Sequence, residues 1–481
     1  MRPETTFTSA EECSLIVEEA LAILETTGMC FGRSQALDVL ADAGARVDRE
    51  AGVARLPADL VEQTVARLTR EVLLPGLTPD DDCLLEPGRI HFLPSGGPNV
   101  TLDFETGEYR PSTVEDVRRA TIVADAMEPA DILWALVGAT DVEPERELFR
   151  ELLTMAAWDR KHIQEDVTFP WQVEPALEIF ATLCGGLAAY RERPRFSSIC
   201  CTTSPLAVDG DLLDASIGLA CYGCPIVAYP MPVAGATAPL TVAGVVAVNV
   251  AEFLRVTTAI ELAAPGSRLI MGVGTSLLDM KATTFSFGAL ETALMCATGV
   301  DVAHCLGVPA LAPGLATDSK YGGIQAGYEK ALKGLVVAAA GSDLITGGIG
   351  LLSGAGIMSL PQIVIDAEIA TMIGRLLEGA EISDETVQAD TIERLGFEAK
   401  YLNEKDTSRR LRSGEVFMPE VATRLSLDGW RAAGRDEAAA ANDRVREIIA
   451  AADARGPLLP PETIAHLDAI AAEAQARQAG G

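Results

Sequence analysis

The sequence has few basic, aromatic and histidine side chains. Its 481 residues include 38 Lys and Arg against 69 Asp and Glu, which gives a formal charge of −31. A polyanion is repelled by phosphate backbones and by anionic lipid, which argues against a nucleic-acid or membrane-surface role. Only 4 histidines are present, too few to favour a multi-histidine zinc site. Aromatic residues make up 5% and hydrophobic residues 48%, so the expected core is large and aliphatic.

A long uninterrupted apolar run is also missing. The most apolar segment, residues 242–250, is too short to span a bilayer and is followed by Glu252 and Arg255. No basic stretch followed by an apolar run opens the sequence, so we expect no secretory signal. The 10 cysteines are scattered, as is typical of reduced thiols. These features predict a soluble, cytoplasmic protein.

From residue 89 onward, short β-rich runs alternate with Ala- and Leu-rich stretches of helical spacing. Eight strand-like runs occur, at residues 90–94, 132–137, 162–166, 196–202, 226–229, 269–273, 310–312 and 344–346. This alternation is typical of parallel βαβ units, and eight of them close best as an α/β barrel of the (β/α)8 type. An open, doubly wound sheet is the alternative, although it usually needs fewer strands.

The remaining sequence predicts additions at both ends of the barrel. We expect an N-terminal accessory segment of helices and hairpins, the barrel, and a helical C-terminal extension, over residues 1–88, 89–380 and 381–481 respectively. The predicted accessory elements are helices and two hairpins, at residues 10–27, 34–43, 45–56 and 99–110. The C-terminal extension is expected to stay helical, and its residues 424–451 are rich in Ala, Arg and Glu.

Two familiar motifs are present only in part. Cys221 and Cys224 have the spacing of a metal or redox pair, but they precede the fifth strand and therefore lie at the wrong face, which favours packing. The glycines at 272–274 lack the third glycine of a dinucleotide fingerprint, since Leu277 stands there. The glycines after the eighth strand lack it too, although that loop commonly binds an anion in such barrels.

Chemistry in a (β/α)8 barrel takes place at the carboxyl ends of the strands, and polar and aromatic side chains gather there. They are Asn99, Glu165, Asp166, Phe169, Trp171, Thr202, Thr203, Ser204, Tyr229, Asp279, Phe285, Phe287, Asp318, Lys320 and Tyr321. Aromatic faces with one or two carboxylates suit a quaternary ammonium group, which cannot donate hydrogen bonds. For any one of these aromatics, packing within a loop is the alternative.

Residues 317–330, which read Thr-Asp-Ser-Lys-Tyr-Gly-Gly-Ile-Gln-Ala-Gly-Tyr-Glu-Lys, resemble the trimethylamine:corrinoid methyltransferase family. The similarity is to its pyrrolysine-free branch, which includes glycine betaine methyltransferases. Weaker matches occur at Met271-Gly272, Asp279-Met280, Gly288, Glu291, Asp366-Ala367-Glu368, Tyr401-Leu402, Pro419 and Asp428-Gly429-Trp430. The chain departs from the family pattern at Gly323, where we expect an acidic residue, and at Asp406, where we expect a histidine.

The resemblance implies a barrel that docks a separate corrinoid protein over its top face. It implies transfer of a methyl group to Co(I) of that partner's cobalamin, with no cofactor or metal tightly held by the barrel. Pyrrolysine-containing members act on trimethylamine through that residue. Because this chain contains none, the resemblance implies a small quaternary amine of the betaine type as substrate.

These observations define a predicted site. We assign catalytic roles to Asp318, Lys320 and Gln325. The predicted substrate-binding residues are Asn99, Glu165, Tyr229, Phe285, Tyr321 and Gly348. Gln325 should fall in the first turn of the next helix, whose positive end would hold a substrate carboxylate together with Lys320. The alternative is that Asp318 caps that helix and Lys320 is solvated.

Two other functions stay open at this stage. One is a barrel lyase or aldolase that forms a Schiff base with a lysine; Lys161 begins its strand, at the wrong face, which leaves Lys320. The other is a non-catalytic subunit that binds betaine-like cations or the corrinoid protein. Homo-oligomerisation is also left open.

Overall fold

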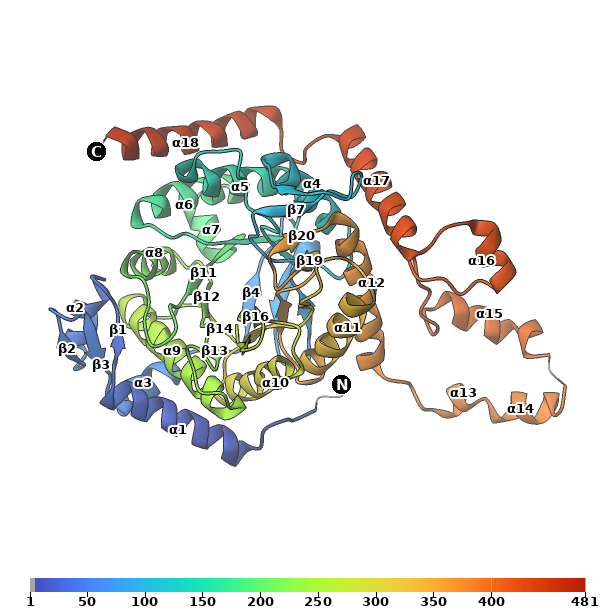
Figure 1. The fold of residues 1–481 in the computed structure, drawn as a ribbon, viewed down its shortest axis with the longest axis horizontal. Helices are drawn as coiled ribbons and strands as arrows, with labels where there is room; N and C mark the ends of the chain where they lie inside the picture. The colour runs from blue at the N-terminus through green and yellow to red at the C-terminus, as the bar shows by residue number, and fades with distance from the viewer. Residues whose placement is uncertain (1–4, 399, 481) are drawn as a thin grey trace.

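The computed structural model, which describes residues 5–398 and 400–480, contains an eight-stranded parallel sheet (Figure 1). The strands are β6 (His91–Phe92), β9 (Ile132–Trp134), β10 (His162–Glu165), β11 (Phe196–Cys201), β12 (Ile226–Tyr229), β14 (Leu269–Gly272), β17 (Ala310–Pro313) and β18 (Leu344–Thr346). β6 and β9 are the two ends of the sheet, and a parallel bridge between Phe92 and Ala130 joins them. The backbone N–H of Asp131 donates to the Phe92 carbonyl at 2.9 Å. The predicted (β/α)8 barrel is therefore confirmed, and the open sheet is excluded.

Helices follow the strands and surround the barrel (Figure 1). They are α4 (Val114–Asp125), α5 (Pro144–Trp158), α6 (Pro170–Cys184), α7 (Leu187–Glu192), α8 (Gly210–Ala220), α9 (Val242–Ala263), α10 (Leu290–Cys305), α11 (Ile324–Ala339) and α12 (Leu360–Glu378). The helical stretch after the third strand is divided in two, because α6 ends at Gly185, which takes a left-handed φ of 85°, and α7 follows it.

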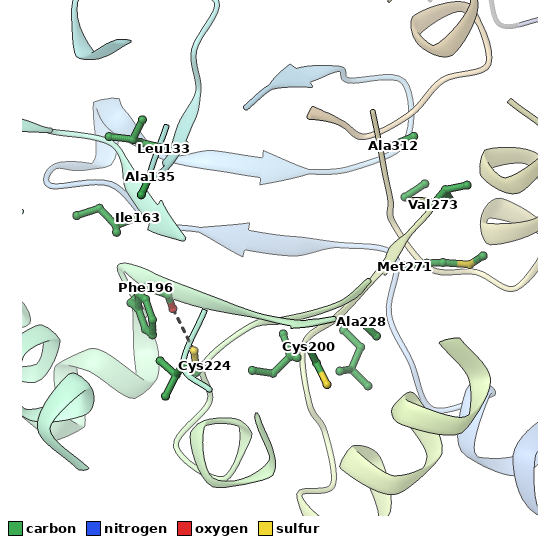
Figure 2. Packing of buried hydrophobic residues seen from close by; sticks show 14 of the residues in the cluster. Leu133, Ala135, Ile163, Phe196, Cys200, Cys224, Ala228, Met271, Val273 and Ala312 are labelled. Carbon is green, nitrogen blue, oxygen red and sulfur yellow. Dashed lines mark hydrogen bonds between the residues drawn. The ribbon is translucent and has the colours of Figure 1, made fainter. Parts of the chain in front are cut away.

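Neighbouring residues on each strand face opposite sides of the barrel wall. Figure 2 shows the outward-facing residues, among them Cys200, Ala228, Met271 and Ala312, packed between the strands and the helices. The preceding residues form a separate cluster inside the barrel, namely Ile199, Val227, Ile270 and Leu311. Because side chains alternate between the two faces of a strand, one aliphatic layer lies under the helices and another lies on the barrel axis.

A hairpin closes the bottom of the barrel. Its strands, β4 (Val72–Leu74) and β5 (Cys83–Leu85), pair antiparallel and join the interior aliphatic cluster. The hairpin is anchored at the amino ends of two barrel strands, because His91 Nε2 lies 3.0 Å from the Leu84 carbonyl and His162 Nδ1 3.1 Å from the Pro75 carbonyl. The interior is therefore filled and covered from below.

The N-terminal elements pack over α9. They are α1 (Ala10–Thr26), β1 (Met29–Cys30), α2 (Ala36–Asp42), β2 (Arg46–Asp48), β3 (Val53–Arg55) and α3 (Ala58–Val65). The predicted first helix and first hairpin are confirmed, and Ser9 caps α1. Because the barrel lies on one side of α9 and α1–α3 on the other, most of α9 is buried. Among the described residues, α9 is the one helix that is long enough and apolar enough to cross a membrane. In the structure, 78% of its most apolar 18-residue stretch is buried inside the protein.

The C-terminal region returns to the barrel after a projecting segment. α17 (Glu437–Arg455) packs on α12 and α4, and α18 (Pro461–Gly480) packs on α5 and α6. The Ala-, Arg- and Glu-rich stretch at residues 424–451 forms two helices, since α16 (Leu427–Ala433) ends at Gly434 with a left-handed φ of 64° and α17 follows it. Between α12 and α16, four short helical segments extend away from the barrel (Figure 1).

Two small sheets lie at the carboxyl ends of the barrel strands. One comprises β13 (Val233–Ala234), β15 (Ser276–Asp279) and β16 (Thr284–Ser286). The other comprises β19 (Leu351–Leu352), β20 (Ile357–Met358), β7 (Val100–Leu102) and β8 (Tyr109–Pro111). The pairing of β7 with β8 confirms the second predicted hairpin. Together these sheets form the rim of the barrel mouth.

Candidate active site at the barrel mouth

Two adjacent carboxyl groups lie at the end of β10. Glu165 is 7% exposed, and its Oε1 accepts hydrogen bonds from Trp134 Nε1 at 3.1 Å and from the Asp166 backbone N–H at 2.9 Å. The second oxygen of Glu165, Oε2, is buried without a hydrogen-bond partner in the protein, and so is Asp166 Oδ1. Two carboxyl oxygens inside the mouth therefore remain available to a ligand.

A third carboxyl group joins this pair from α5. Glu151 accepts a hydrogen bond from the Ala139 backbone N–H at 3.0 Å, yet burial raises its pKa to about 8. Burial also raises the pKa of Asp166 to about 7. Burial, followed by the charges of Glu151 and Asp166, raises the pKa of Glu165 well above its usual value. We call Glu151, Glu165 and Asp166 the acidic cluster.

In the residues that the structure describes, no Lys or Arg forms an ion pair with the acidic cluster. Without a counter-charge, buried carboxyl groups this close together keep protons near neutral pH. A bound cation would supply the missing charge and favour their ionised form. The cluster is therefore suited to a positively charged ligand.

Two aromatic residues lie above the aliphatic interior, and one of them, Trp134, also contacts the acidic cluster through Glu165. Tyr229, 7% exposed at the end of β12, belongs to the interior cluster of Val227 and Ile270, and half-buried Trp134 packs against it. Glycines leave room for the tyrosine ring, because a Cβ on Gly272 would lie 2.2 Å from Tyr229 Cδ2. A Cβ on Gly274 would lie 2.9 Å from Tyr229 Cε1. The partial glycine motif is thus explained by aromatic packing.

The polar residues after β11 serve the loop that carries them. Glu252 on α9 is fully buried and accepts hydrogen bonds from Thr202 Oγ1, from Ser204 Oγ at 2.8 Å and from the Leu206 backbone N–H at 2.8 Å. Three donor groups are thereby satisfied within the protein. The segment from Thr202 to Leu206 is held against α9 rather than free to bind a ligand.

Asp318 joins the loop after β17 to the rim. Its Oδ1 accepts from the Phe287 backbone N–H at 2.9 Å, and its Oδ2 accepts from Ser286 Oγ. Glu329 on α11 supports the same loop, accepting from Thr317 Oγ1 at 2.6 Å and from the Asp318 backbone N–H at 2.9 Å. The motif carboxylates thus fasten the loop to α11 and β16.

A buried ion pair fastens the next loop. Lys330 and Asp366 are both fully buried, with Nζ and Oδ2 2.7 Å apart. Lys330 Nζ also donates to the Gly348 carbonyl at 2.5 Å, and the Gly350 backbone N–H donates to Asp366 Oδ2 at 2.8 Å. A Cβ on Gly348 would lie 1.9 Å from the Leu315 carbonyl oxygen, so the two loops touch at this glycine.

Other predicted residues lie on the exposed rim. Lys320 donates to the Asp318 carbonyl at 2.7 Å, and Gln325, in the first turn of α11, donates to Glu329 Oε1 at 2.9 Å. Phe285 and Tyr321 are 59% and 63% exposed. Asn99 is exposed as well, beside β7, where its Oδ1 would lie 2.5 Å from a Cβ on Gly138.

The two departures from the family pattern have structural settings of their own. A Cβ on Gly323 would lie 2.6 Å from Tyr321 Cε2, so this glycine makes room for the tyrosine ring at the rim. Asp406 lies in α15 (Lys405–Arg412), outside the barrel, and pairs with Arg410 at 2.7 Å.

The predicted residues therefore occupy three settings. Glu165 and Tyr229 lie inside the mouth. Asp318 and Gly348 take part in the hydrogen bonds that hold the loops after β17 and β18 in place. The rim carries Asn99, Lys320, Gln325, Phe285 and Tyr321. Trp134 and Glu151 are the members of the inner site that the sequence did not reveal. Trp134 ends the second strand, and that position is the signal that identifies it. Glu151 lies on a helix and has no such signal.

The fold and this mouth define a barrel enzyme of the α/β class, and comparisons with known proteins identify the family. The sequence model for trimethylamine methyltransferase (MTTB) matches residues 1–479, so the chain belongs to this family of methyltransferases. The trimethylamine methyltransferase MttB of Desulfitobacterium hafniense (strain DSM 10664 / DCB-2) is 30% identical over 426 residues, 89% of this chain and 85% of that protein. The glycine betaine methyltransferase of Desulfitobacterium hafniense (strain Y51) is 26% identical over 477 residues, 98% of this chain and 97% of that protein.

A solved structure agrees on the fold. The hydroxylamine complex of MtmB superposes with a TM-score of 0.54 at 13% identity, covering 92% of this chain and 89% of that one. An identity this low supports the fold alone. Relatives with two different named substrates have similar identities, so the substrate has to be argued from the site.

Proposed function

We propose that this protein transfers a methyl group from a small quaternary amine of the betaine type to Co(I) of a cobalamin-bearing corrinoid protein. The acidic cluster carries the proposal. It offers two buried, unpartnered carboxyl oxygens, Trp134 donates to Glu165, and the ring of Tyr229 lies over the same aliphatic interior as Trp134. Aromatic faces and carboxylates bind a quaternary ammonium group by charge and shape, without needing hydrogen bonds from it.

The chemistry requires little of the protein's own side chains. Co(I) attacks the methyl carbon, the carbon–nitrogen bond breaks, and its electron pair stays on nitrogen, which leaves as a neutral tertiary amine. No proton has to be added or removed. The barrel's task is to hold the methyl group in line with the acceptor and to exclude water. This explains a mouth with aromatic rings and carboxyl groups but without a nucleophile–base pair.

The rim fits a docking protein that carries the corrinoid. Large apolar side chains surround the mouth and are exposed, namely Met231, Leu240, Met280, Phe285 and Tyr321. A partner face placed over them would bury these side chains and seal the mouth from solvent. The ten free cysteines agree with a reducing cytoplasm, where we place this reaction.

The carboxylate end of a betaine would point toward the rim. There Lys320 carries an exposed ammonium group, and the first turn of α11 presents its positive end at Gln325. We therefore propose that Lys320 and Gln325 hold this end, while Glu165 and Asp166 hold the ammonium end.

Methyl transfer is tested with purified protein, reduced corrinoid protein or free cob(I)alamin, and a panel of amines. Glycine betaine, proline betaine, carnitine and choline share the quaternary nitrogen, and trimethylamine is the matched non-quaternary compound. We expect methylated corrinoid, followed by its absorbance, with one or more quaternary amines and little with trimethylamine. Equal turnover of trimethylamine and every quaternary amine would refute the substrate class.

A Schiff-base lyase is less consistent with the structure. Lys161 is buried at the amino end of its strand, and its Nζ donates to the carbonyls of Ala124 and Met127, both at 2.9 Å. Borohydride trapping with a carbonyl substrate tests this alternative. Binding of a quaternary amine without any turnover would instead indicate a non-catalytic subunit.

A further inference from the structure

The inward-facing residues of the eight barrel strands form two successive layers beneath the mouth. The lower layer is fully buried and consists of Leu93, Ile132, Gln164, Ile199, Val227, Ile270, Leu311 and Leu344. Because side chains on one face of a strand recur at every second residue, the upper layer lies two residues further along each strand. It consists of Ser95, Trp134, Asp166, Cys201, Tyr229, Gly272, Pro313 and Thr346.

Solvent reaches one part of this upper layer. Trp134, Asp166 and Cys201 are half-buried, whereas the other five residues of the layer are buried. The three half-buried residues follow β9, β10 and β11 at their carboxyl ends, and these strands are neighbours in the sheet. They therefore form one continuous part of the inner wall, which we call the open section.

The open section carries the groups that attract a quaternary ammonium ion. Asp166 Oδ1 has no hydrogen-bond partner in the protein, and Trp134 contributes an aromatic ring whose N–H is already engaged by Glu165. An aromatic ring and an unpaired carboxyl oxygen bind such a cation by charge and shape. The ammonium end of the proposed substrate therefore fits against the open section better than against the buried remainder of the layer.

Cys201 is the third member of the open section. It pairs with Tyr229 on the ladder between β11 and β12, whereas its neighbour Cys200 faces the helices (Figure 2). Burial, followed by the charge of Asp166, raises the pKa of the Cys201 thiol well above its usual value, so the thiol stays neutral near pH 7. A neutral, polarisable sulfur gives N-methyl groups an apolar contact, without a strong polar group that they would desolvate.

We propose that Cys201 contacts the N-methyl groups of the bound amine and sets the size of head group that the site accepts. The inference rests on the proposed function and adds a specificity-determining residue to it. A side chain larger than cysteine occupies the place of an N-methyl group. A smaller one leaves room for the longer N-ethyl group.

Isothermal titration calorimetry without the corrinoid protein tests this role. The probes are glycine betaine, proline betaine, carnitine and choline, each beside its analogue with N-ethyl in place of N-methyl groups. Wild type should prefer the methyl compounds. Cys201→Ala should shift the ratio of the two Kd values toward the ethyl analogue by about tenfold, and Cys201→Leu should weaken binding of the methyl compound by about tenfold or more. Cys200→Ala removes a buried thiol from the other face of the same strand and should leave both Kd values unchanged.

The ratio of two Kd values measured on one variant does not depend on how much of that variant is folded, so a loss of fold cannot imitate the shift. A ratio in Cys201→Ala equal to that of wild type would overturn the inference, and so would wild-type affinity in Cys201→Leu. Either result, with methyl transfer intact in wild type, leaves the proposed function standing. A wild type that neither binds nor demethylates any of the four amines would refute the proposed function, and this inference with it.

Discussion

The affinity for a quaternary ammonium ion should depend on pH through the acidic cluster. A permanent cation binds best when a carboxylate faces it, and burial raises the pKa of Asp166 to about 7. The ionised fraction of such a group is about nine-tenths near pH 8 and about one-tenth near pH 6, so the affinity should fall about tenfold between them. The cluster titrates as one unit, and ligand binding near pH 7 should release up to about one proton.

Isothermal titration calorimetry measures both quantities. Titrations with the preferred quaternary amine at several pH values give the affinity, and two buffers of different ionisation enthalpy give the protons released. Asp166→Asn should lower the affinity about tenfold near pH 8 and flatten the pH profile. Glu128→Gln, which changes an exposed carboxylate outside the mouth, is the control. An affinity that stays constant from about pH 6 to about pH 8, with no proton released, would refute the role given to the cluster.

Three further predictions concern stability and the rim. Burial raises the pKa of Asp159 from 3.8 to about 7, so between these values the folded protein keeps a proton that the unfolded chain releases. The free energy of unfolding, measured in urea, should therefore fall as the pH rises from about 4 to about 7. Asp159→Asn should make this fall smaller. Lys330→Met leaves Asp366 buried without its partner and should lower the free energy of unfolding by about 3–5 kcal/mol. Adding Asp366→Leu should restore part of that loss. A double variant less stable than Lys330→Met alone would contradict this. Lys320→Ala and Gln325→Ala should each lower kcat/KM about tenfold or more with little change in Tm, because both side chains are exposed; normal turnover would show that they only support the loop.

The barrel strands were predictable because each is a short run of β-branched or aliphatic residues between two helical stretches. Their number then indicated closure. Helix ends were harder to predict: an Ala- and Arg-rich stretch looks continuous in sequence, and Gly434 stops it only because it takes a left-handed φ of 64°. The hairpin beneath the barrel was not predicted either, since nothing local distinguishes β4 and β5 from surface strands. Their burial depends on a cavity that only the closed barrel creates.

The candidate site was predicted unevenly for a related reason. Positions that directly follow strands, such as Glu165 and Tyr229, can be located from the fold alone. Glu151 comes from an Arg- and Glu-rich helix that resembles a solvated face, and only tertiary packing brings it to Asp166. Asp318 was found from its motif instead, and its carboxylate accepts hydrogen bonds from Ser286 and Phe287 at the rim, so its catalytic role stays a prediction.

The hairpin covers the bottom of the barrel, and the candidate site lies at the opposite end, in the mouth. Val72, Leu74 and Leu85 close the floor, so a substrate enters, and a product leaves, through the mouth. A protein that docks over that mouth obstructs this route. Under the proposed reaction the order of events is then fixed: the amine enters before the corrinoid protein docks, and the demethylated amine leaves after it departs. Steady-state rates should therefore decline when the corrinoid protein is in large excess, because an early docking event traps an empty barrel.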